Sequence, residues 1–356
     1  MKMPEFNQVA KIKVFGIGGG GCNAVSRMIE EGVQGVEFYV ANTDAQVLET
    51  TQVKNKIVLG SLGAGANPEI GRKSAEDHKD EIKKAMEGAD MIYITAGMGG
   101  GTGTGAAPVF AKIAKEMGAL TVGIVTKPFS FEGPRRTRQA LEGLEELRKH
   151  VDSLIIVSNN QLLKTIGNIP LTESFKEADN VLRQGVQTVT DLIAVPSLIN
   201  LDFADVRSVM EGQGNALIGI GIDQSDDRAR RAAEKAIQSP LLEAKMSGAK
   251  KAIVNVTGGN SITIQDANDA AEYISEAAGY DLDIIFGLSI NEKLGDAVVV
   301  TVIATGFDSA ETKAPTPKAA SSIGRTIQNE RETTTTKRSI FEDDMSEIPS
   351  FFRNRF

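Results

Sequence analysis

The chain has 356 residues with 39 basic and 47 acidic side chains, so its length suggests two domains and its net charge of −8 argues against a nucleic-acid partner. One cysteine and two histidines exclude an internal disulfide and a structural zinc site, and they argue against a Ser-His-Asp hydrolase. No apolar run approaches the ~20 residues that cross a bilayer, and residues 1–13 show no secretory signal, so we expect a cytoplasmic protein without membrane insertion.

The first half of the chain alternates strand and helix patterns. Apolar runs predict strands at 12–17, 36–41, 56–59, 91–96, 120–126 and 154–158, and helical spacing predicts helices at 22–31, 72–87, 107–117 and 135–149. Strands that are apolar on both faces and alternate with helices indicate a parallel sheet covered on both sides. We therefore predict an α/β fold, with a first domain at 11–172 after a flexible N-terminus at 1–10.

A long helical pattern follows at about 173–193, and Pro196 ends it. A helix of about 20 residues spans ~30 Å, so this segment, taken as 173–195, is predicted to be a central helix connecting two domains. Residues 196–307 combine four strand patterns with two helical ones; the strands are at 217–222, 251–257, 283–288 and 297–304, and the helices at 227–238 and 264–277. Fewer helices per strand predict a smaller C-terminal α+β domain with a four-stranded sheet.

The alternating pattern stops after Phe307. Residues 308–340 contain no aromatic side chain and cannot bury enough apolar surface to offset their ordering entropy, so we predict a disordered linker. Residues 341–356 instead concentrate four phenylalanines, Ile348 and Pro349 beside charged residues. This contrast predicts a C-terminal recognition peptide.

Two glycine-rich loops each follow a predicted strand and precede a predicted helix. Residues 18–21 are four consecutive glycines, and residues 97–105 hold six glycines in nine positions. A glycine turn at a helix N-terminus offers free N–H groups and a positive dipole end to an anion. Two such loops at the carboxyl ends of parallel strands can enclose one polyphosphate. We favour this interpretation over packing or flexible surface turns, because so many glycines carry a large entropy cost.

The first loop taken alone also fits a dinucleotide site. Gly16, Gly18 and Gly21 satisfy G-x-G-x-x-G, and Asp44 follows the second strand near the place of a ribose-binding acid. An NAD-dependent Rossmann dehydrogenase is therefore an alternative, although it leaves residues 97–105 unexplained. The chain has no G-x-x-x-x-G-K-[ST] motif, so backbone N–H groups and a bound Mg²⁺, whose protein ligands are unknown, must neutralise the phosphate charge.

Residues 97–108, GMGGGTGTGAAP, resemble the signature loop of the tubulin/FtsZ superfamily of GTPases. Further segments match its bacterial FtsZ branch in order, namely GGGGCNAV at 18–25, NTDA at 42–45, LGAGANP at 62–68, KPFSFEG at 127–133 and NLDFADV at 200–206. The resemblance covers about residues 11–306 and the terminal peptide. Ser197 departs from the family, which usually has glycine there, and Cys22 occupies a variable position.

The resemblance implies a Rossmann-like GTP-binding domain that binds GTP or GDP, with Mg²⁺ beside the phosphates. It assigns the phosphates to the two glycine loops, and it stacks Phe175 on the guanine. The residues it places at the nucleotide are Gly19, Gly20, Gly21, Cys22, Asn23, Asp44, Gly101, Thr102, Gly103, Glu132, Arg136, Phe175, Asp179 and Asn180. Without the resemblance, Asp179 and Asn180 on the long helix would be read as a solvated helix face.

Asn200, Asp202 and Asp205 follow the long helix. Their spacing alone predicts a helix start, with Asp202 as the N-cap and Asp205 favourable in the first turn. The resemblance adds a catalytic role, in which this loop completes the GTP site of the next subunit and polarises the attacking water. A nucleotide face at one end and a complementary loop at the other imply a head-to-tail homopolymer.

The resemblance therefore implies a GTP-hydrolysing cytoskeletal protein that forms the bacterial division ring at midcell, under the cytoplasmic membrane. Its terminal residues 347–356 are expected to bind membrane-tethering and regulatory division proteins. A non-hydrolysing nucleotide-binding scaffold is a second alternative. Asp202 and Asp205 argue against it, and a phosphate-release assay distinguishes it from a GTPase.

Overall fold

The structure, a computed structural model, describes residues 10–166, 170–194, 198–199, 201–238, 246, 248–279 and 281–307. The predicted linker and recognition peptide at 308–356 lie outside the described residues, as do residues 1–9, Ser197 and Asn200. The described elements all belong to one compact unit of the chain.

The described strands form one sheet in the order β3-β2-β1-β4-β5-β6-β7-β10-β8-β9. They are β1 (Ile12–Ile17), β2 (Val36–Asn42), β3 (Asn55–Val58), β4 (Met91–Gly97), β5 (Leu120–Lys127), β6 (Ser153–Ser158), β7 (Gly214–Asp223), β8 (Lys251–Gly258), β9 (Asp283–Ile290) and β10 (Val298–Thr305). Neighbours from β3 to β7 are parallel, which confirms the predicted parallel sheet. The strand order reverses between β1 and β4, and ligands of such sheets bind beyond the carboxyl ends at this switch point.

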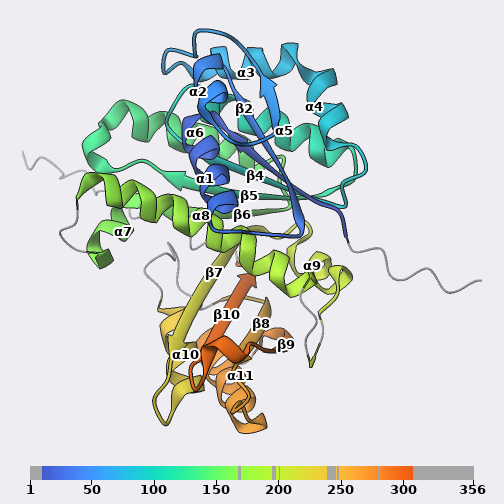
Figure 1. Cartoon of the computed structure of the whole chain (residues 1–356), viewed down its shortest axis with the longest axis vertical. Helices are drawn as coiled ribbons and strands as arrows, with labels where there is room; N and C mark the ends of the chain where they lie inside the picture. The colour runs from blue at the N-terminus through green and yellow to red at the C-terminus, as the bar shows by residue number, and fades with distance from the viewer. Residues whose placement is uncertain are drawn as a thin grey trace, which may run out of the picture. The chain divides into compact units, whose positions relative to one another are not determined.

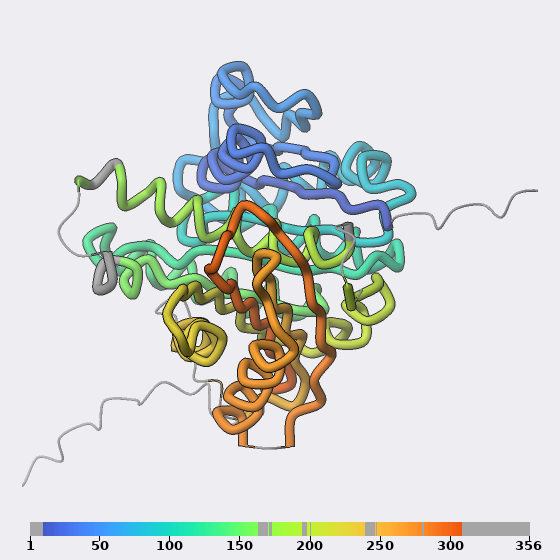
Figure 2. Tube along the Cα trace, turned by 60° about the horizontal axis from the view of Figure 1, so that its bottom comes forward, coloured from blue at the N-terminus to red at the C-terminus, as the bar shows by residue number. Residues whose placement is uncertain are grey.

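Helices cover the sheet and connect its strands (Figure 1). They are α1 (Gly18–Glu30), α2 (Ala45–Thr50), α3 (Pro68–Asp77), α4 (Lys79–Met86), α5 (Thr102–Glu116), α6 (Pro134–Arg148), α7 (Asn159–Ile166), α8 (Leu171–Ala194), α9 (Phe203–Met210), α10 (Arg228–Ile237) and α11 (Ile264–Ala278), with 3-10 turns η1 (Ser130–Glu132) and η2 (Glu292–Leu294). The predicted long helix is α8. It runs between the strands of the first half and β7–β10, which the turned trace in Figure 2 also shows.

The single helix predicted at 72–87 is wrong, because the structure has two helices there, α3 and α4. They are separated at His78, where φ is −107° and ψ is 20°. The His78 Nδ1 lies 2.8 Å from the carbonyl oxygen of Ser74. The sequence patterns also missed the short helices α2 and α7.

The four strands predicted for the second half are present as β7–β10, and they continue the first sheet. β7 pairs in parallel with β6 over residues 153–155 and 214–216, and antiparallel with β10. Hydrogen bonds between β6 and β7 therefore join the two halves of the chain directly.

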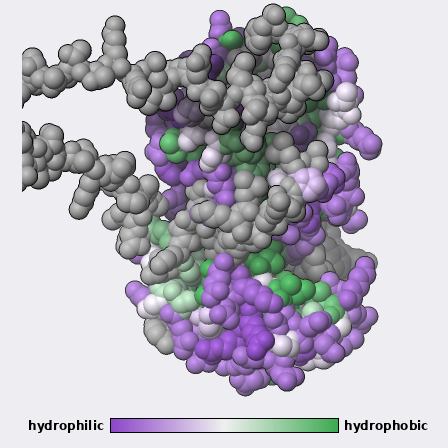
Figure 3. All heavy atoms as spheres, turned by 90° about the vertical axis from the view of Figure 1, so that its left-hand side faces the viewer, coloured by the Kyte–Doolittle hydropathy of each residue, from purple (hydrophilic) through white to green (hydrophobic). Residues whose placement is uncertain are grey.

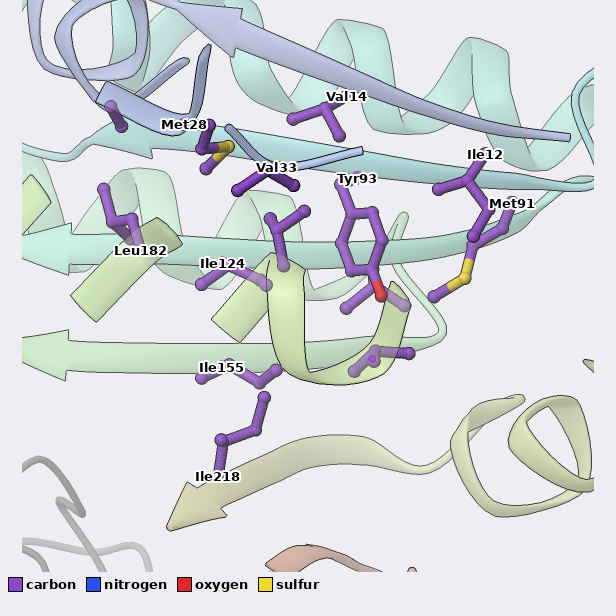
Figure 4. Close-up of a cluster of buried hydrophobic side chains, with 14 of the residues drawn as sticks. Ile12, Val14, Met28, Val33, Met91, Tyr93, Ile124, Ile155, Leu182 and Ile218 are labelled. Atoms are coloured by element: carbon purple, nitrogen blue, oxygen red, sulfur yellow. The ribbon is translucent and has the colours of Figure 1, made fainter. Parts of the chain in front are cut away.

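Three clusters of buried side chains make up the described core. One lies between the sheet and α4–α6, and a second lies on α10 and α11 against β8–β10. The third packs α1, α8 and α9 on the sheet, and Figure 4 shows part of it, with Met28, Tyr93, Ile124, Leu182 and Ile218 in one layer. Because Ile218 belongs to β7, this cluster spans the junction between the two halves.

None of the described helices is long and apolar enough to cross a membrane. The face drawn in Figure 3 is mostly hydrophilic over the described part of its lower half, with separate apolar patches. The most exposed large apolar side chains of the described residues are Leu62 and Ile264, at 95% and 86%.

Candidate nucleotide site

The first glycine loop leaves no residue between strand and helix, because β1 ends at Ile17 and α1 begins at Gly18. Ile17 provides no side-chain cap, so the first-turn N–H groups of α1 can face an anion. Gly18 has a φ of 71°, and a Cβ there would lie 2.7 Å from the backbone nitrogen of Gly103. A Cβ on Gly19, in contrast, would meet no atom within 4 Å. The two glycine loops therefore touch at Gly18, and Gly19 has the open space that a phosphate needs.

The second glycine loop, after β4, is built in the same way. α5 begins at Thr102 without a side-chain cap from Gly101. Gly99 has a φ of 102° and donates its N–H to Thr104 Oγ1 at 2.8 Å, while a Cβ on Gly100 would meet open space. Two uncapped helix starts thus meet at the neighbouring strands β1 and β4, an arrangement that can hold a polyphosphate from two sides.

Other residues of these loops that were predicted to contact the nucleotide pack against the rest of the protein instead. A Cβ on Gly21 would lie 2.4 Å from the Thr95 carbonyl oxygen, and one on Gly20 would lie 3.2 Å from Gly97 Cα. Cys22 is 2% exposed, and burial raises the pKa of its thiol to about 12. The Cys22 side chain therefore belongs to the core and is unreactive near neutral pH.

The segment after β2 meets the second glycine loop through a hydroxyl pair, and the Gly63 N–H of the loop at residues 62–68 donates to the Thr43 carbonyl oxygen at 2.9 Å. Thr43 Oγ1 lies 2.6 Å from Thr102 Oγ1, and neither hydroxyl is exposed. Ala66 has a φ of 57°, and its carbonyl oxygen accepts a hydrogen bond from Gln139 Nε2 of α6 at 3.2 Å. Thr43 is thus a contact that the sequence analysis did not assign, although it lies in the NTDA segment.

Residues predicted to meet the base lie on α1 and α8, which pack against each other. Phe175 is 42% exposed and meets the Phe129 ring edge-on at 5.2 Å between centroids, so its ring is available for stacking. Burial raises the pKa of Asp179 from 3.8 to about 7, and the charge of Arg27 on α1 opposes the rise. Asn23, one helical turn before Arg27, is exposed. An aromatic ring, an amide and a carboxyl group together suit a purine base.

Two further predicted positions already have partners within the chain. The side-chain Oδ1 of Asn180 accepts hydrogen bonds from Arg183 Nε at 2.9 Å and from Arg183 Nη2 at 2.7 Å, so this oxygen is not free for the base. Glu132 forms an ion pair with Arg136 and accepts the N–H of Phe129 at 2.9 Å. The Glu132–Arg136 pair therefore fixes η1 and the start of α6 beside the Phe129–Phe175 contact.

Polar residues also follow the carboxyl ends of β2 and β6. Asp44 follows β2 and caps α2 by accepting the N–H of Gln46 at 3.0 Å. Asn159 follows β6 and is 5% exposed, and its Oδ1 has no hydrogen-bond partner among the described residues. A buried, unpartnered oxygen at this edge is suited to a ligand. The sequence analysis missed Asn159, although its place directly after a predicted strand was a usable signal.

The predicted catalytic acids lie at the other end of the sheet. Asp202 caps α9 by accepting the N–H of Asp205, and Asp205 accepts the N–H of Asp202, each at 2.9 Å. This reciprocal arrangement confirms the predicted helix start. On the next turn, Arg207 Nη2 lies 3.5 Å from the carbonyl oxygen of Asp90, the residue before β4. The acids are thus near the amino end of β4, roughly 20 Å of strand away from the glycine loop at its carboxyl end.

Among the described residues, no group of three or more His, Cys, Asp or Glu side chains converges as a metal site. The glycine loops nevertheless offer the N–H groups and open space that a Mg²⁺–triphosphate requires. A Mg²⁺ ion there fits coordination by phosphate oxygens and water, which this ion commonly keeps.

Residues 11–167 match the model of the Tubulin/FtsZ family, GTPase domain, and residues 214–308 match the FtsZ family, C-terminal domain. An empty FtsZ dimer from M. jannaschii is 43% identical, with a TM-score of 0.79 over 84% of this chain and 89% of that chain. The chain belongs to the FtsZ family. A mutant FtsZ from the same organism matches at 43% identity and a TM-score of 0.79, over 84% of this chain and 92% of that chain.

A GDP-bound CetZ1 monomer from Haloferax volcanii shares the fold, at 20% identity and a TM-score of 0.74 over 85% of this chain and 96% of that chain. GTP binding and hydrolysis are properties of the tubulin/FtsZ family. FtsZ membership therefore favours GTP over a nicotinamide dinucleotide as the ligand of the two glycine loops. It also identifies the chain as a tubulin-like member of a cell-division family.

Proposed function

We propose that this protein hydrolyses GTP within a head-to-tail homopolymer, in which Asp202 and Asp205 of one subunit complete the GTP site of the next. The observation that supports the proposal is that the glycine loops and the two acids lie far apart within one chain. The glycine loops follow the carboxyl ends of β1 and β4, whereas the acids lie beside the amino end of β4. A relative of 43% identity, FtsZ of M. jannaschii, is known as a dimer, which supports self-association.

The glycine loops bind and orient the nucleotide in this proposal. Backbone N–H groups at the starts of α1 and α5 face the phosphates, and the ion-paired Glu132 and Arg136 would meet the ribose and phosphate region, as the family resemblance implies. Phe175 stacks on the guanine, and the ionised Asp179 carboxylate accepts hydrogen bonds from guanine N–H groups. A Mg²⁺ ion bound with the nucleotide would neutralise part of the phosphate charge.

The acids act on the water in the neighbouring subunit's site. In the capping box, Asp202 uses Oδ1 and Asp205 uses Oδ2, so each carboxylate keeps a second oxygen for a water molecule. That oxygen accepts a hydrogen bond from the water and orients it in line with the γ-phosphorus. The water oxygen bonds to phosphorus as the bond to the β–γ bridging oxygen breaks, and the water protons finish on phosphate and solvent. We propose that Asn200, outside the described residues, assists in the same loop.

The cellular role follows from the family. We propose that the filament forms the division ring at midcell, in the cytoplasm under the membrane. Residues 347–356, which contain EIPSFFRNR, would bind membrane-tethering and regulatory division proteins. Many weakly binding copies along one filament would give the avidity that holds it there.

Complementation between two single variants tests the shared site. Asp205→Asn keeps an oxygen that can accept the Asp202 N–H, so α9 keeps its cap, but it removes the catalytic charge. Asp179→Asn keeps the acid loop but removes the base-binding carboxylate. At a GTP concentration below the wild-type KM, we expect Asp205→Asn alone to release phosphate about 10²-fold more slowly than wild type. Asp179→Asn alone should be at least about tenfold slower, because it binds GTP more weakly. A 1:1 mixture should recover about a quarter of the wild-type rate, because each chain is intact at only one of its two ends.

Asp227→Asn is the matched control, since Asp227 is the N-terminal flanking residue of α10 and makes no side-chain capping bond. It should hydrolyse GTP at the wild-type rate. A mixture that stays inactive, although both variants are folded, would contradict the shared site. GTP hydrolysis by Asp205→Asn at the wild-type rate would show that Asp205 has only a structural role at the start of α9. Wild-type filaments that release no phosphate would support the non-hydrolysing scaffold.

A further inference from the structure

The acid-bearing helix α9 is fixed at its C-terminal end by side chains from three strands. Lys251 Nζ of β8 donates to the carbonyl oxygen of Ser208 at 2.9 Å, and Thr305 Oγ1 of β10 donates to that of Val209 at 2.8 Å. Ser153 Oγ of β6 donates to the last carbonyl oxygen of α9 at 2.6 Å. The last carbonyls of a helix have no partner within it, so these bonds anchor the end of α9 that is away from the acids.

The chain that enters α9 is held by β9. The N–H groups of Leu198 and Ile199 both donate to the Leu288 carbonyl oxygen, at 2.8 and 3.2 Å, and the Leu288 N–H donates to Ile199 at 3.2 Å. β9 ends the sheet order, so Leu288 turns its backbone groups towards this segment and not towards another strand. This isolated β-bridge between Ile199 and Leu288 lies three residues before Asp202, a path of at most about 10 Å.

Gly287 provides the second contact with the entering chain. Leu201, directly before Asp202, is 6% exposed. A Cβ on Gly287 would lie 2.9 Å from Leu201 Cδ1 and 2.7 Å from Asn255 Oδ1, both closer than real Cβ contacts. The Leu201 side chain therefore packs on the bare backbone of β9, and a Cβ at position 287 requires the ends of the Leu201 and Asn255 side chains to shift.

We propose that Gly287 and Leu288 are positioning residues for GTP hydrolysis, because they place Asp202 and Asp205 for the next subunit's site. This inference rests on the proposed shared site. The C-terminal anchors and the buried Val206 and Val209 keep α9 folded when its first turn moves. A change in β9 should therefore shift the acids without removing the helix. The nucleotide loops, at the opposite ends of the strands, should be unaffected.

Gly287→Ala in the full chain tests the inference. We expect kcat per polymerised subunit to fall about tenfold, since a displacement of about 1 Å in a catalytic group can cost up to 10²-fold. KM for GTP and the affinity for a fluorescent GTP should stay at wild-type values, because the nucleotide loops are unchanged. Mixing Gly287→Ala with Asp179→Asn should restore phosphate release, because the Asp179→Asn chain supplies an intact acid loop to the GTP site of Gly287→Ala. Ser289→Ala is the matched control, because Ser289 also contacts Asn255 from β9, at 3.4 Å, and it should leave kcat unchanged.

The outcomes separate this inference from the proposed function. Wild-type kcat in Gly287→Ala, with Asp205→Asn inactive, would overturn the positioning role and leave the shared site standing. Wild-type kcat in Asp205→Asn would overturn the shared site itself. If Gly287→Ala does not assemble, Leu201→Ala carries the same test, because it removes the packing from the other side. Filaments of Leu201→Ala with wild-type kcat would then overturn the inference.

Discussion

The Asp179 carboxyl group is predicted to oppose folding and to favour GTP binding at the same pH. Burial raises its pKa from 3.8 to about 7, and Arg27 opposes the rise only in part. The folded, nucleotide-free protein therefore binds the proton more tightly than the unfolded chain. The stability that this proton provides is complete below about pH 4 and is lost as the pH rises through 7. Above pH 7 the folded protein must hold a half-buried negative charge.

The substitution Asp179→Asn removes this charge and keeps the shape of the side chain. A pKa rise from 3.8 to about 7 corresponds to an upper limit of about 4 kcal/mol, at about 1.36 kcal/mol for each pKa unit. Water still reaches the side chain and screens its charge, so we expect a gain of about 1–2 kcal/mol in the free energy of unfolding at pH 8. The gain should vanish near pH 4, where the wild-type carboxyl group is also neutral.

Nucleotide binding should respond in the opposite direction. In the proposed site, the guanine N–H groups donate to the ionised Asp179 carboxylate, so the GTP affinity of the wild type should rise as the pH passes through 7. Loss of a charged hydrogen bond costs about 1.5–3 kcal/mol, so Asp179→Asn should bind GTP at least about tenfold more weakly at pH 8. Denaturant unfolding without nucleotide and the anisotropy of labelled GTP, both from pH 5 to 8, measure the two effects.

Asp191→Asn is the matched control, because Asp191 lies on the same helix and desolvation also raises its pKa. It is not among the predicted base contacts, so its substitution should leave GTP affinity unchanged at every pH. A lower stability of Asp179→Asn than of wild type at pH 8 would contradict the cost of the buried charge. Wild-type GTP affinity of Asp179→Asn would contradict the role of this carboxylate at the base.

Two further predictions concern stability. The Tyr93 hydroxyl is fully buried without a hydrogen-bond partner among the described residues, so Tyr93→Phe should raise the free energy of unfolding by about 1 kcal/mol in urea titrations; a loss would show that the hydroxyl has a partner. Lys13 is 7% exposed and donates to the carbonyl oxygens of Ala85 and Glu87 at the end of α4. Lys13→Met should therefore lower the same free energy by about 2 kcal/mol, because it leaves two carbonyl groups unpaired, and an unchanged midpoint would contradict this role.

The spacing of apolar residues and the residue types at helix and strand ends were enough to predict most of the fold. The strands are continuous apolar runs, and the Asp202–Asp205 spacing is a capping signal that depends only on neighbouring residues. The break at His78 was not predictable in this way, because residues 72–87 include no proline or glycine near it. The pairing of β6 with β7 was equally hidden, since a three-residue ladder between distant segments depends on tertiary placement.

The sequence predicts which loops form the candidate site, but it does not predict what each residue of those loops contacts. The two glycine loops do meet at neighbouring strands, but the sequence does not distinguish Gly19, beside open space, from Gly21, packed against Thr95. Both are glycines, and only the approach of β4 separates them. Asn159 was missed for a related reason, because its importance lies in an oxygen that is buried and unpartnered in the described structure.

The continuous sheet bears on polymerisation as well as on the fold. A head-to-tail contact that does not close into a ring requires a fixed geometry between the two contacting ends of each subunit. In the proposed filament, one end would be formed by the loops after β1 and β4, and the other by α9, which side chains of β6, β8 and β10 anchor. Because β6 and β7 are hydrogen-bonded, strand ladders and not a flexible linker set the geometry between these ends. Each added subunit would then present its acids to the next GTP in the same orientation, which is what hydrolysis at every contact of a filament requires.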